Sequence, residues 1–519
     1  MRDRSIALTK SRFAAPRWTT DSPEWQALDR QLSADHKARW IDTFVKGLDL
    51  SELEALYRGS GSQAYSPELM LKIGLYETLE GHLSPAAWAR HLHEHIPLQW
   101  LGLGIQPSRT ALYNFRDRVG YVIDALLADM IGTARREGLV QGEQGVGDGT
   151  TIRAHASRHR LLNQPRLQKR LEALRAAVEL DTAGQSLAER PAWMAATVRG
   201  RRQQRQRYLE AQAVLERRLV ENAKKPKDRR LAPEKVMVSF SDPEAPMGRD
   251  KEKVFGPLYT TQFIIEPCSL LIVAFDVFPL ATDAGTLPPM LDQAQRMLGR
   301  GLDTIITDAG YVSILDLQAC AQRHVALIAP VHENDYTQAK ETTKAQPKSQ
   351  AQKKTQAPSK PPIGKDQFTW DPQEQTYRCP QGHRLQYIRR QRKTRRQGDS
   401  VVLHQYQCPG AHCRECPLKS RCVKDPNKGR IVIRTEGEEL LEEHRRKMAT
   451  PEAKKLRKLR GQVIERGFGD AKHHRNLRKL HGRGLHRAKA EIGLVVLAQN
   501  ALMLHRLRQQ AVTPVEIAA

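Results

Sequence analysis

The 519-residue sequence has no long uninterrupted apolar run. Its longest apolar stretch, near Ile492 to Leu504, contains Gln499 and Asn500 and is too short to cross a bilayer. The opening residues, MRDRSIALTK, lack the apolar core of a secretory signal. We therefore expect a protein that is neither membrane-inserted nor secreted and that works in the cytoplasm.

Acidic residues are scarce relative to basic ones. There are 58 Asp and Glu against 84 Lys and Arg, so the formal net charge is +26. An excess of this size usually meets polyphosphate or an anionic membrane surface. Because no membrane anchor is evident, nucleic acid is the favoured partner. The length suffices for two or three domains, each with its own core.

Cysteines are few, and their distribution argues against a disulfide framework. Five of the seven lie between Cys379 and Cys422. Cys413 and Cys416 have the spacing of a zinc knuckle, and tetrahedral thiolates can fix a segment too small to bury its own core. We predict a structural zinc site, with reduced surface cysteines as the alternative. The predicted ligands are Cys379, Cys408, Cys413, Cys416 and Cys422, with His383 and His412 in reserve.

Helix-start signals organise residues 36–140. Ser66-Pro67 and Ser84-Pro85 each place a hydroxyl before a proline at the first helical position. Ser108 is expected to begin a third helix, and a fourth is expected from about Tyr121 to Arg136. Short helices joined by tight turns are typical of a helix-turn-helix-like DNA-binding domain, with a plain dimerisation bundle as the alternative.

A strand-rich segment follows at residues 141–335. We predict strands at 148–154, 235–239, 258–266, 270–277, 303–308 and 325–331, and helices at 285–298 and 313–323. Early strands followed by alternating helices and strands indicate an α/β sheet covered on both faces. Leucine stripes within residues 164–230 predict an inserted helical hairpin. Cys268 and Cys320 lie in apolar contexts and are expected in the core.

The remaining segments differ in composition. Residues 1–35 form an N-terminal arm. Residues 336–366 have no large apolar residue before Ile363 and are expected to be a disordered basic linker. Residues 367–434 hold the cysteine module. Residues 435–519 are expected to be helical, with a charged helical region over about 436–480 and an apolar helix over about 488–507.

Three acidic residues stand in distinctive phrases: Asp148 in VGDGT, Asp308 in IITDAGY and Glu465 in VIERGFGDAK. We expect the aspartates at the ends of short strands, which hold a carboxylate rigidly, and the glutamate on a basic helix. Carboxylates brought together can hold two divalent metal ions, which cut and join phosphodiesters. A single Asp at a strand end is more often a turn or cap residue, so only the fold can unite the three.

These phrases, in this order, resemble those of the DDE-type transposases of bacterial insertion sequences. The segments SPELMLKIGLY, RTALYNFR and RGLHRAKAE are also family-like. The resemblance implies a ribonuclease-H-like mixed-sheet core with an all-helical N-terminal domain. It implies that Asp148, Asp308 and Glu465 are catalytic and hold two Mg²⁺ (or Mn²⁺) ions. It also implies double-stranded DNA as partner and at least a homodimer when active.

Other residues in family-like segments are expected to support the site. Asp242, Asp283 and Glu491 are interpreted as structural, and Asp276 is a weaker rival to Asp148. Many relatives carry Tyr and Arg at fixed spacing before the glutamate. Here Arg457 and Arg460 are nearby but no tyrosine is present, which leaves their roles open.

Basic residues near these motifs are the expected DNA contacts. Lys472 lies seven residues after Glu465 and would share its helix face, which Arg475 and Arg478 would extend. A second basic patch precedes Cys408 and could grip a DNA backbone in a salt-dependent way, with a solvated loop as the alternative. Its basic residues include Arg389, Arg390, Arg392, Lys393 and Arg395.

The expected function is that of a nucleoid-associated transposase. It would bind the terminal inverted repeats of its element, hydrolyse a strand at each end, and join the freed 3′ ends to target DNA. Two alternatives remain: a catalytically inactive DNA-binding protein, and a nuclease without strand transfer. The second alternative stays open because hydrolysis and transfer use the same metals.

Overall fold

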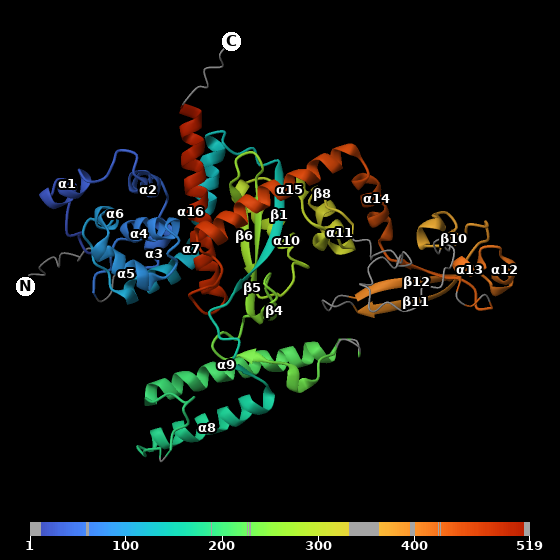
Figure 1. Ribbon diagram of the computed structural model, residues 1–519, viewed down its shortest axis with the longest axis horizontal. Coiled ribbons are helices and arrows are strands. Elements are labelled where there is room, and N and C mark those ends of the chain that lie inside the picture. Colours follow the sequence, from blue (N-terminus) through green and yellow to red (C-terminus); the bar gives the residue numbers. More distant parts are fainter. Residues whose placement is uncertain are drawn as a thin grey trace, which may run out of the picture. The chain divides into compact units, whose positions relative to one another are not determined.

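The computed structural model describes residues 12–512, apart from 59–61, 188, 226, 228–229, 332–362, 395–399, 424 and 426. The chain divides into two compact units (Figure 1). The first comprises the chain up to Thr307, Cys320–Ile328 and the chain from Lys455 onward; the second comprises Asp308–Ala319 and Ala329–Lys454. No described helix has the length and apolar content that a membrane span requires.

A helical region precedes the sheet of the first unit. Its helices are α1 (Pro23–Asp29), α2 (Lys37–Lys46), α3 (Ser51–Ala55), α4 (Pro67–Leu79), α5 (Pro85–Glu94), α6 (Ile96–Leu101) and α7 (Arg109–Arg136). α4 and α5 begin at the predicted prolines, but neither Ser66 nor Ser84 caps its helix with the hydroxyl. The hydroxyl of Ser108 does cap α7, accepting from the Ala111 amide at 3.2 Å.

The predicted third and fourth helices are a single helix, α7, of 28 residues. Gly120 does not end it because this glycine faces α16 (Leu485–Val512). A Cβ at position 120 would lie 2.9 Å from both Ala490 and His486. Close packing of two long helices therefore outweighs the cost of about 1 kcal/mol that an interior glycine imposes. In the predicted N-terminal arm, α1 is also ordered: Trp25 stacks on Trp100 at 5.3 Å between ring centroids.

The central sheet of the first unit has six strands. They are β1 (Gln144–Arg153), β4 (Met247–Arg249), β5 (Phe255–Ile265), β6 (Ile272–Phe278), β7 (Thr304–Ile306) and β8 (Ala326–Ile328). β5 pairs antiparallel with β1, β4 and β6, whereas β1 pairs parallel with β7, and β7 with β8. α10 (Leu287–Leu298) packs on β5 and β6, and α16 packs on β6 and α7.

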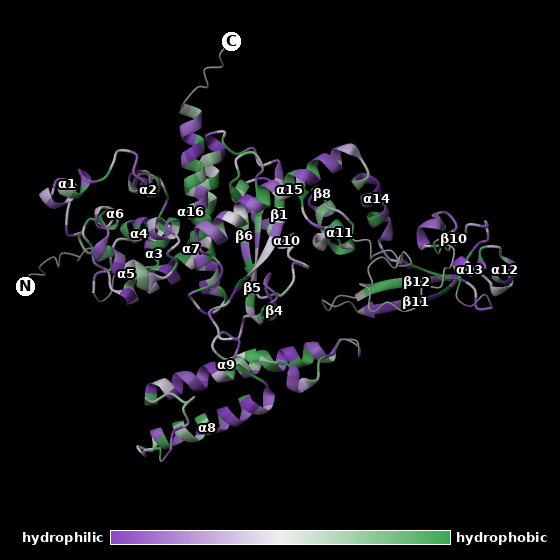
Figure 2. Ribbon diagram, in the orientation of Figure 1, coloured by the Kyte–Doolittle hydropathy of each residue, from purple (hydrophilic) through white to green (hydrophobic). Residues whose placement is uncertain are grey.

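The inserted helical hairpin is confirmed as α8 (Gln164–Thr182) and α9 (Val198–Ala223). Arg170 donates to the Tyr208 hydroxyl at 3.0 Å, and Arg201 to Asp181 at 2.7 Å, so the two helices run antiparallel. In Figure 2 hydrophilic and hydrophobic residues alternate along both helices. That alternation fits helices that bury one face against each other and expose the rest.

Two predictions for the core were wrong. The strand expected at 235–239 is only β3 (Val238–Ser239), and it pairs with β2 (Leu161–Leu162) outside the central sheet. The short strand closes the base of the hairpin, where Val238 is fully buried against hairpin residues. Cys268 is exposed, because it lies in the turn between β5 and β6 rather than in the core, whereas Cys320 is buried as expected.

The second unit holds the cysteine module. Its elements are β9 (Thr369–Asp371), β10 (Thr376–Arg378), β11 (Gln386–Thr394), β12 (Ser400–Gln407), α12 (Gly410–Glu415), α13 (Lys419–Cys422), β13 (Ile431–Thr435) and α14 (Glu438–Met448). The rings of Trp370, Tyr377 and Tyr406 pack together at 4.9–5.7 Å between centroids. Ile363 is 4% exposed and joins this core, so the predicted linker ends earlier than expected. The rest of that linker, up to residue 362, lies outside the described residues.

The predicted charged helical region over 436–480 is interrupted. α14 ends at Met448, and α15 (Pro451–Gly469) begins at a proline, which cannot continue the preceding helix. A short π-helical turn, η6 (Asp470–His474), extends α15, and the chain is not helical again until α16.

Candidate functional site

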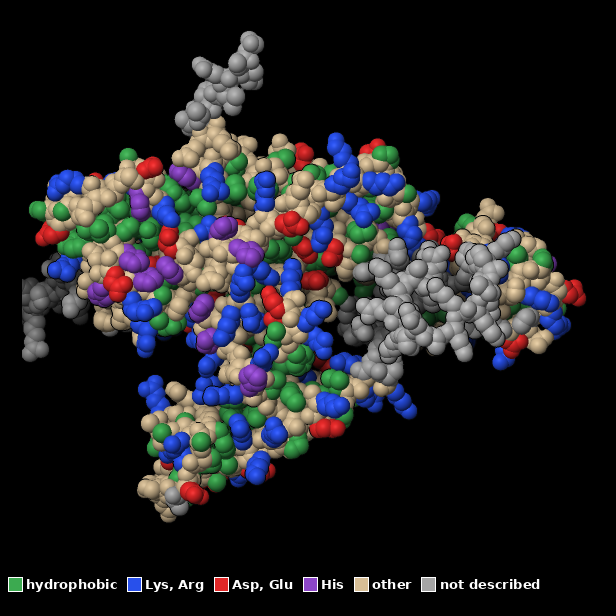
Figure 3. All heavy atoms as spheres, viewed as in Figure 1, with side chains coloured by type: hydrophobic (Ala, Val, Ile, Leu, Met, Phe, Trp, Pro, Cys, Tyr) green, Lys and Arg blue, Asp and Glu red, His purple; other side chains and the backbone are tan. Residues whose placement is uncertain are grey.

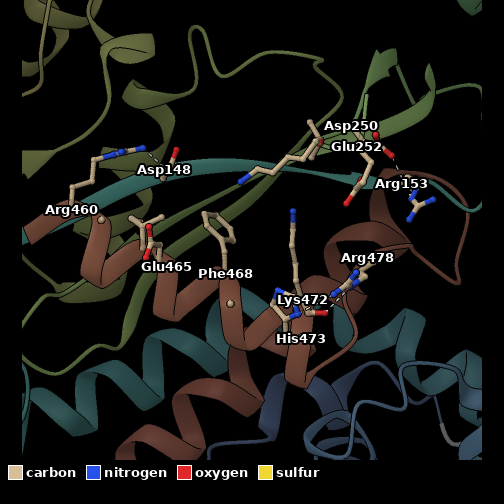
Figure 4. Close-up of a pocket in the computed structure, with 15 residues that line it drawn as sticks. Asp148, Arg153, Asp250, Glu252, Arg460, Glu465, Phe468, Lys472, His473 and Arg478 are labelled. Atoms are coloured by element: carbon tan, nitrogen blue, oxygen red, sulfur yellow. Dashed lines mark hydrogen bonds and ion pairs between the residues drawn. The ribbon is translucent and has the colours of Figure 1, made fainter. Parts of the chain in front are cut away.

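A cavity of about 650 Å³ in the first unit lies between β1, the turn joining β4 to β5, and the end of α15. Figure 4 shows Asp148 on the strand and Glu465, Phe468 and Lys472 on the facing helical segment. The charged side chains lining the cavity are Asp148, Asp250, Glu252, Glu465, Arg153, Lys251, Arg460, Lys472 and Arg478. Carboxylates and cations therefore share one open space, as recognition of a phosphate beside a metal ion would need.

An aromatic stack holds α15 over the strand that carries Asp148. The rings of Phe468 and Phe263 stack at 4.6 Å between centroids. Phe263 on β5 is the register partner of Asp148 on β1, so both side chains project from the same face of the sheet. Glu465 precedes Phe468 by one helical turn and therefore lies on the helix face turned toward β1. This packing brings Glu465 and Asp148 to one cavity.

Asp148 is not at a strand end, as the sequence analysis expected, but in the middle of the ten-residue strand β1. Its Oδ2 accepts from the Arg460 guanidinium at 2.8 Å. Its side chain is 18% exposed, so the carboxylate is held at the cavity wall with limited access to solvent. The role of Arg460, which the sequence left open, therefore includes an ion pair with Asp148.

The glycines around Asp148 lie within β1, where close neighbours restrict the space for a side chain. A Cβ at Gly149 would collide with Asp283 and with Gln262, whose amide donates to Asp283 at 2.6 Å. A Cβ at Gly145 would lie 2.9 Å from Leu302. The sheet thus accepts these glycines because neighbouring side chains occupy the space. Asp283 has the supporting role expected of it.

Lys472 reaches the same strand two residues beyond Asp148. Its ammonium donates to the Thr150 hydroxyl at 2.5 Å. Burial, and then the nearby Lys251, lower the pKa of Lys472 to about 8. A half-buried ammonium facing an open cavity can gain from an incoming anion, because a phosphate would replace part of its lost hydration.

The other two predicted DNA contacts of this region, Arg475 and Arg478, lie in different environments. Arg478 lines the cavity and is exposed. Arg475 is 8% exposed and pairs with Asp470 at 3.1 Å, and it also donates to the Leu79 carbonyl. The prediction that Arg475 extends a DNA-facing surface is therefore wrong, since the chain leaves the helix before this residue and turns it inward.

Asp308 stands at the first position of the second unit, directly after Thr307. It is half-buried, and its carboxylate accepts from the Gly310 amide at 2.7 Å. It follows β7 by two residues, just as Asp148 follows Val146, the register partner of Ile306 at the end of β7. Asp308 is not among the residues lining the cavity that holds Asp148 and Glu465.

Sequence reasoning missed the turn between β4 and β5. Asp250, Lys251 and Glu252 lie in this turn and line the cavity. The Asp250 carboxylate lies 3.7 Å from the Arg153 guanidinium of β1. No signal in the sequence tied the alternating charges of RDKEK to Asp148.

Other family-like acidic residues are structural, as expected. Asp242 is 1% exposed and accepts from the Tyr259 hydroxyl at 2.8 Å. Glu491 is buried and accepts from Arg116 at 3.0 Å, which joins α16 to α7. Asp276, the weaker rival to Asp148, lies on β6 with the Lys489 ammonium 3.6 Å away.

The second basic patch is not a solvated loop but a strand, β11, paired with β12. Its side chains are exposed at Arg389, Arg390, Arg392 and Lys393. Arg389 donates to Gln405 at 2.9 Å, and the remaining guanidinium groups project from a narrow antiparallel sheet. Arg395 lies outside the described residues.

Five cysteines gather around one small cavity of about 20 Å³ in the second unit, with His383 and His412 beside them. Burial raises the pKa of the Cys408 thiol to about 12, with Cys413 and Cys379 as further causes. These thiols are close neighbours. Among the described residues, however, three potential ligand atoms come within 4.8 Å of one another only at Glu77, His82 and His91.

Comparison with known proteins gives two family matches. Residues 378–505 match a transposase DDE domain, and residues 26–118 match a transposase domain (DUF772). The first match contains Glu465, Lys472 and the five clustered cysteines, while the second covers α2 to α6 of the helical region. No curated protein and no solved structure matches the chain. Both matches are to transposase domains, and together they indicate a DDE-type transposase of an insertion-sequence family.

Proposed function

We propose that this transposase binds the terminal inverted repeats of its element, cleaves DNA strands at the element ends, and joins the resulting 3′ ends to target DNA. One observation carries the proposal: Asp148 and Glu465, from opposite ends of the chain, line one cavity together with Lys472. A metal-dependent phosphodiester site requires such groups.

Asp148, Asp308 and Glu465 are the proposed ligands of two Mg²⁺ (or Mn²⁺) ions. The donor set fits, because these ions prefer oxygen ligands and keep several waters. The ion pair of Asp148 with Arg460 supports an ionised carboxylate at this position. When bound, such a metal pair activates the attacking hydroxyl and stabilises the leaving 3′ oxygen.

Two features support the inclusion of Asp308 and a ribonuclease-H-like fold. The strand order β6-β5-β1-β7-β8 has one antiparallel and one parallel neighbour for β1. Asp148 and Asp308 each follow the parallel register pair Val146 and Ile306 by two residues. Adjacent parallel strands in register carry equivalent positions at the same level.

The residues proposed to contact DNA are Lys472 and Arg478 at the cavity and the exposed Arg and Lys side chains of β11. A backbone contact by Lys472 would place a phosphate beside Asp148, since Thr150 holds this ammonium two residues along β1. The helical region matched by the transposase domain (DUF772) is proposed to recognise the element ends. Because two ends must be brought together, we also propose at least a homodimer in the active complex.

The cysteine cluster is proposed to hold a structural Zn²⁺. Cys379, Cys408, Cys413, Cys416 and Cys422 surround one cavity, and a zinc ion needs four of them. A closed site of this kind would fix a module with a small core, to which Cys408 and Cys413 themselves belong.

The test is Mg²⁺-dependent cleavage of a duplex that carries one element end, comparing wild type with Glu465→Gln and Asp148→Asn. The matched control is Glu452→Gln, an exposed glutamate on the same helix that does not line the cavity. We expect nicking at the element boundary with wild type and the control, and none with the two site variants, while all four bind DNA in a mobility-shift assay.

Three results would contradict the proposal. Binding without cleavage by the wild type, with Mg²⁺ and with Mn²⁺, would indicate a DNA-binding protein that has lost catalysis. Cleavage that leaves 3′ ends unable to attack a target duplex would indicate a nuclease. Equal cleavage by wild type and Glu465→Gln would show that the metal ligand lies elsewhere.

A further inference from the structure

Three side chains converge in the helical region, apart from the catalytic cavity. Glu77 lies in α4, His91 in α5, and His82 in the connection between these helices. The Glu77 carboxylate lies 2.9 Å from Nδ1 of His91 and 3.0 Å from Nδ1 of His82. The rings of His82 and His91 meet edge to face at 4.5 Å between centroids. One potential ligand atom from each residue thus faces a common point.

A bound cation would favour this arrangement. Glu77 is fully buried, and an ionised carboxylate removed from water needs a compensating charge. Nδ1 of His82 is itself buried, and it has no hydrogen-bond partner of acceptable angle among the described residues although Glu77 is near. Nδ1 of His91, in contrast, lies within hydrogen-bonding distance of both Glu77 carboxylate oxygens, at 2.9 and 3.1 Å. A shared ion would give the buried Nδ1 of His82 the partner that it lacks among the described residues. Figure 3 shows histidine side chains gathered over α5.

The donor set indicates which ion would fit. Two imidazole nitrogens and one carboxylate oxygen suit Zn²⁺ and its first-row neighbours, whereas Mg²⁺ prefers oxygen donors alone. Three protein ligands leave a fourth position for water. The His82 side chain is 40% exposed, although its Nδ1 is buried. His95 stacks on His91 at 4.6 Å between centroids and fixes its ring.

We propose that Glu77, His82 and His91 form a binding site for a zinc-class divalent ion in the helical region. The site is separate from the catalytic carboxylates and from the cysteine cluster. It joins the end of α4 to α5 through three side chains.

The site would stabilise a turn that supports the segment after α15. The Leu79 carbonyl, two residues after Glu77, accepts from Arg475. Gly81 packs so closely on this segment that a Cβ there would lie 3.0 Å from the His474 carbonyl. His474 is the last residue of the π-helical turn that carries Lys472, and Arg475 directly follows this turn. A metal ion here would therefore hold the helical region against the segment that forms one wall of the catalytic cavity.

The experiment measures zinc bound per chain in full-length protein that has been stripped with a chelator, saturated with Zn²⁺ and desalted. His82→Ala and His91→Ala are compared with wild type, and His93→Ala is the matched control because His93 is exposed on the same helix. Co²⁺ provides a second readout, since thiolate ligands give intense near-ultraviolet charge-transfer bands and a nitrogen–oxygen site gives only weak visible bands.

We expect His82→Ala and His91→Ala each to lose one equivalent of zinc and the weak visible Co²⁺ bands, while the thiolate bands and the behaviour of His93→Ala are unchanged. The zinc-dependent rise in Tm contributed by this site should also disappear, because a ligand stabilises only a state that binds it. If His91→Ala fails to fold, the partly exposed His82 decides the outcome alone. A His82→Ala protein that folds and retains the full wild-type zinc content and Co²⁺ spectrum would overturn the proposal.

Discussion

The depressed pKa of Lys472 predicts a pH dependence of DNA binding. Lys472 faces Thr150 on β1, Asp250, Lys251 and Glu252 in the turn between β4 and β5, and Arg478 and His473 on its own segment. Burial and the neighbouring cations lower its pKa to about 8. A phosphate is attracted to the charged ammonium form of Lys472 and not to its neutral amine form. Binding should therefore be strongest below pH 8 and weaken as the pH rises through that value.

The magnitude follows from a single proton. With a pKa of about 8, the charged share of Lys472 falls from about nine-tenths at about pH 7 to about one-tenth at about pH 9. If only the charged form contacts the phosphate, affinity falls by about tenfold, or roughly 1.4 kcal/mol. A bound phosphate raises the pKa of Lys472 in the complex. The loss of affinity therefore begins at the pKa of Lys472 in the free protein.

The assay is fluorescence anisotropy with a labelled duplex at constant ionic strength and without divalent metal. Lys472→Arg keeps its charge throughout this range and should remove the pH-dependent loss. Lys458→Arg, an exposed position on α15 outside the cavity, should retain the wild-type slope. Equal slopes for wild type and Lys472→Arg would refute the assignment of this titration to Lys472.

Three further predictions concern stability and metal content. Phe468→Ala removes a buried ring from its stack on Phe263 and should cost about 3–5 kcal/mol in urea unfolding; a loss below about 1 kcal/mol would mean that the stack does not hold α15. Gly149→Ala should destabilise by about 1–3 kcal/mol through overpacking, whereas Gly461→Ala, with open space around its Cβ, should be neutral or gain up to about 1 kcal/mol. The reverse ranking in thermal unfolding would contradict this packing. Cys413→Ser should lose one zinc equivalent and the thiolate bands of the Co²⁺ protein, and unchanged values would remove the cysteine site.

Local patterns in the sequence determined much of the fold. The prolines at the starts of α4 and α5, the leucine stripes of α8 and α9, and the apolar runs of β5 and β6 were sufficient to predict those elements. Each of these signals acts within one or two turns of helix or one strand. The phrase around Glu465 and its seven-residue spacing to Lys472 are also local signals of this kind.

Tertiary structure decided where these parts meet. Gly120 does not break α7 because α16 packs against it. Asp148 lies mid-strand because β1 stays paired with β5 as far as Arg153, beyond the end of its pairing with β7 at Val146. Arg475 turns inward because it pairs with Asp470 and donates a hydrogen bond to the Leu79 carbonyl. The sequence alone determined which residues carry charge and metal-binding chemistry. Only the fold brought Glu465 beside Asp148, and Glu77 beside His82 and His91, because such contacts depend on packing between segments whose sequence spacing carries no periodic signal.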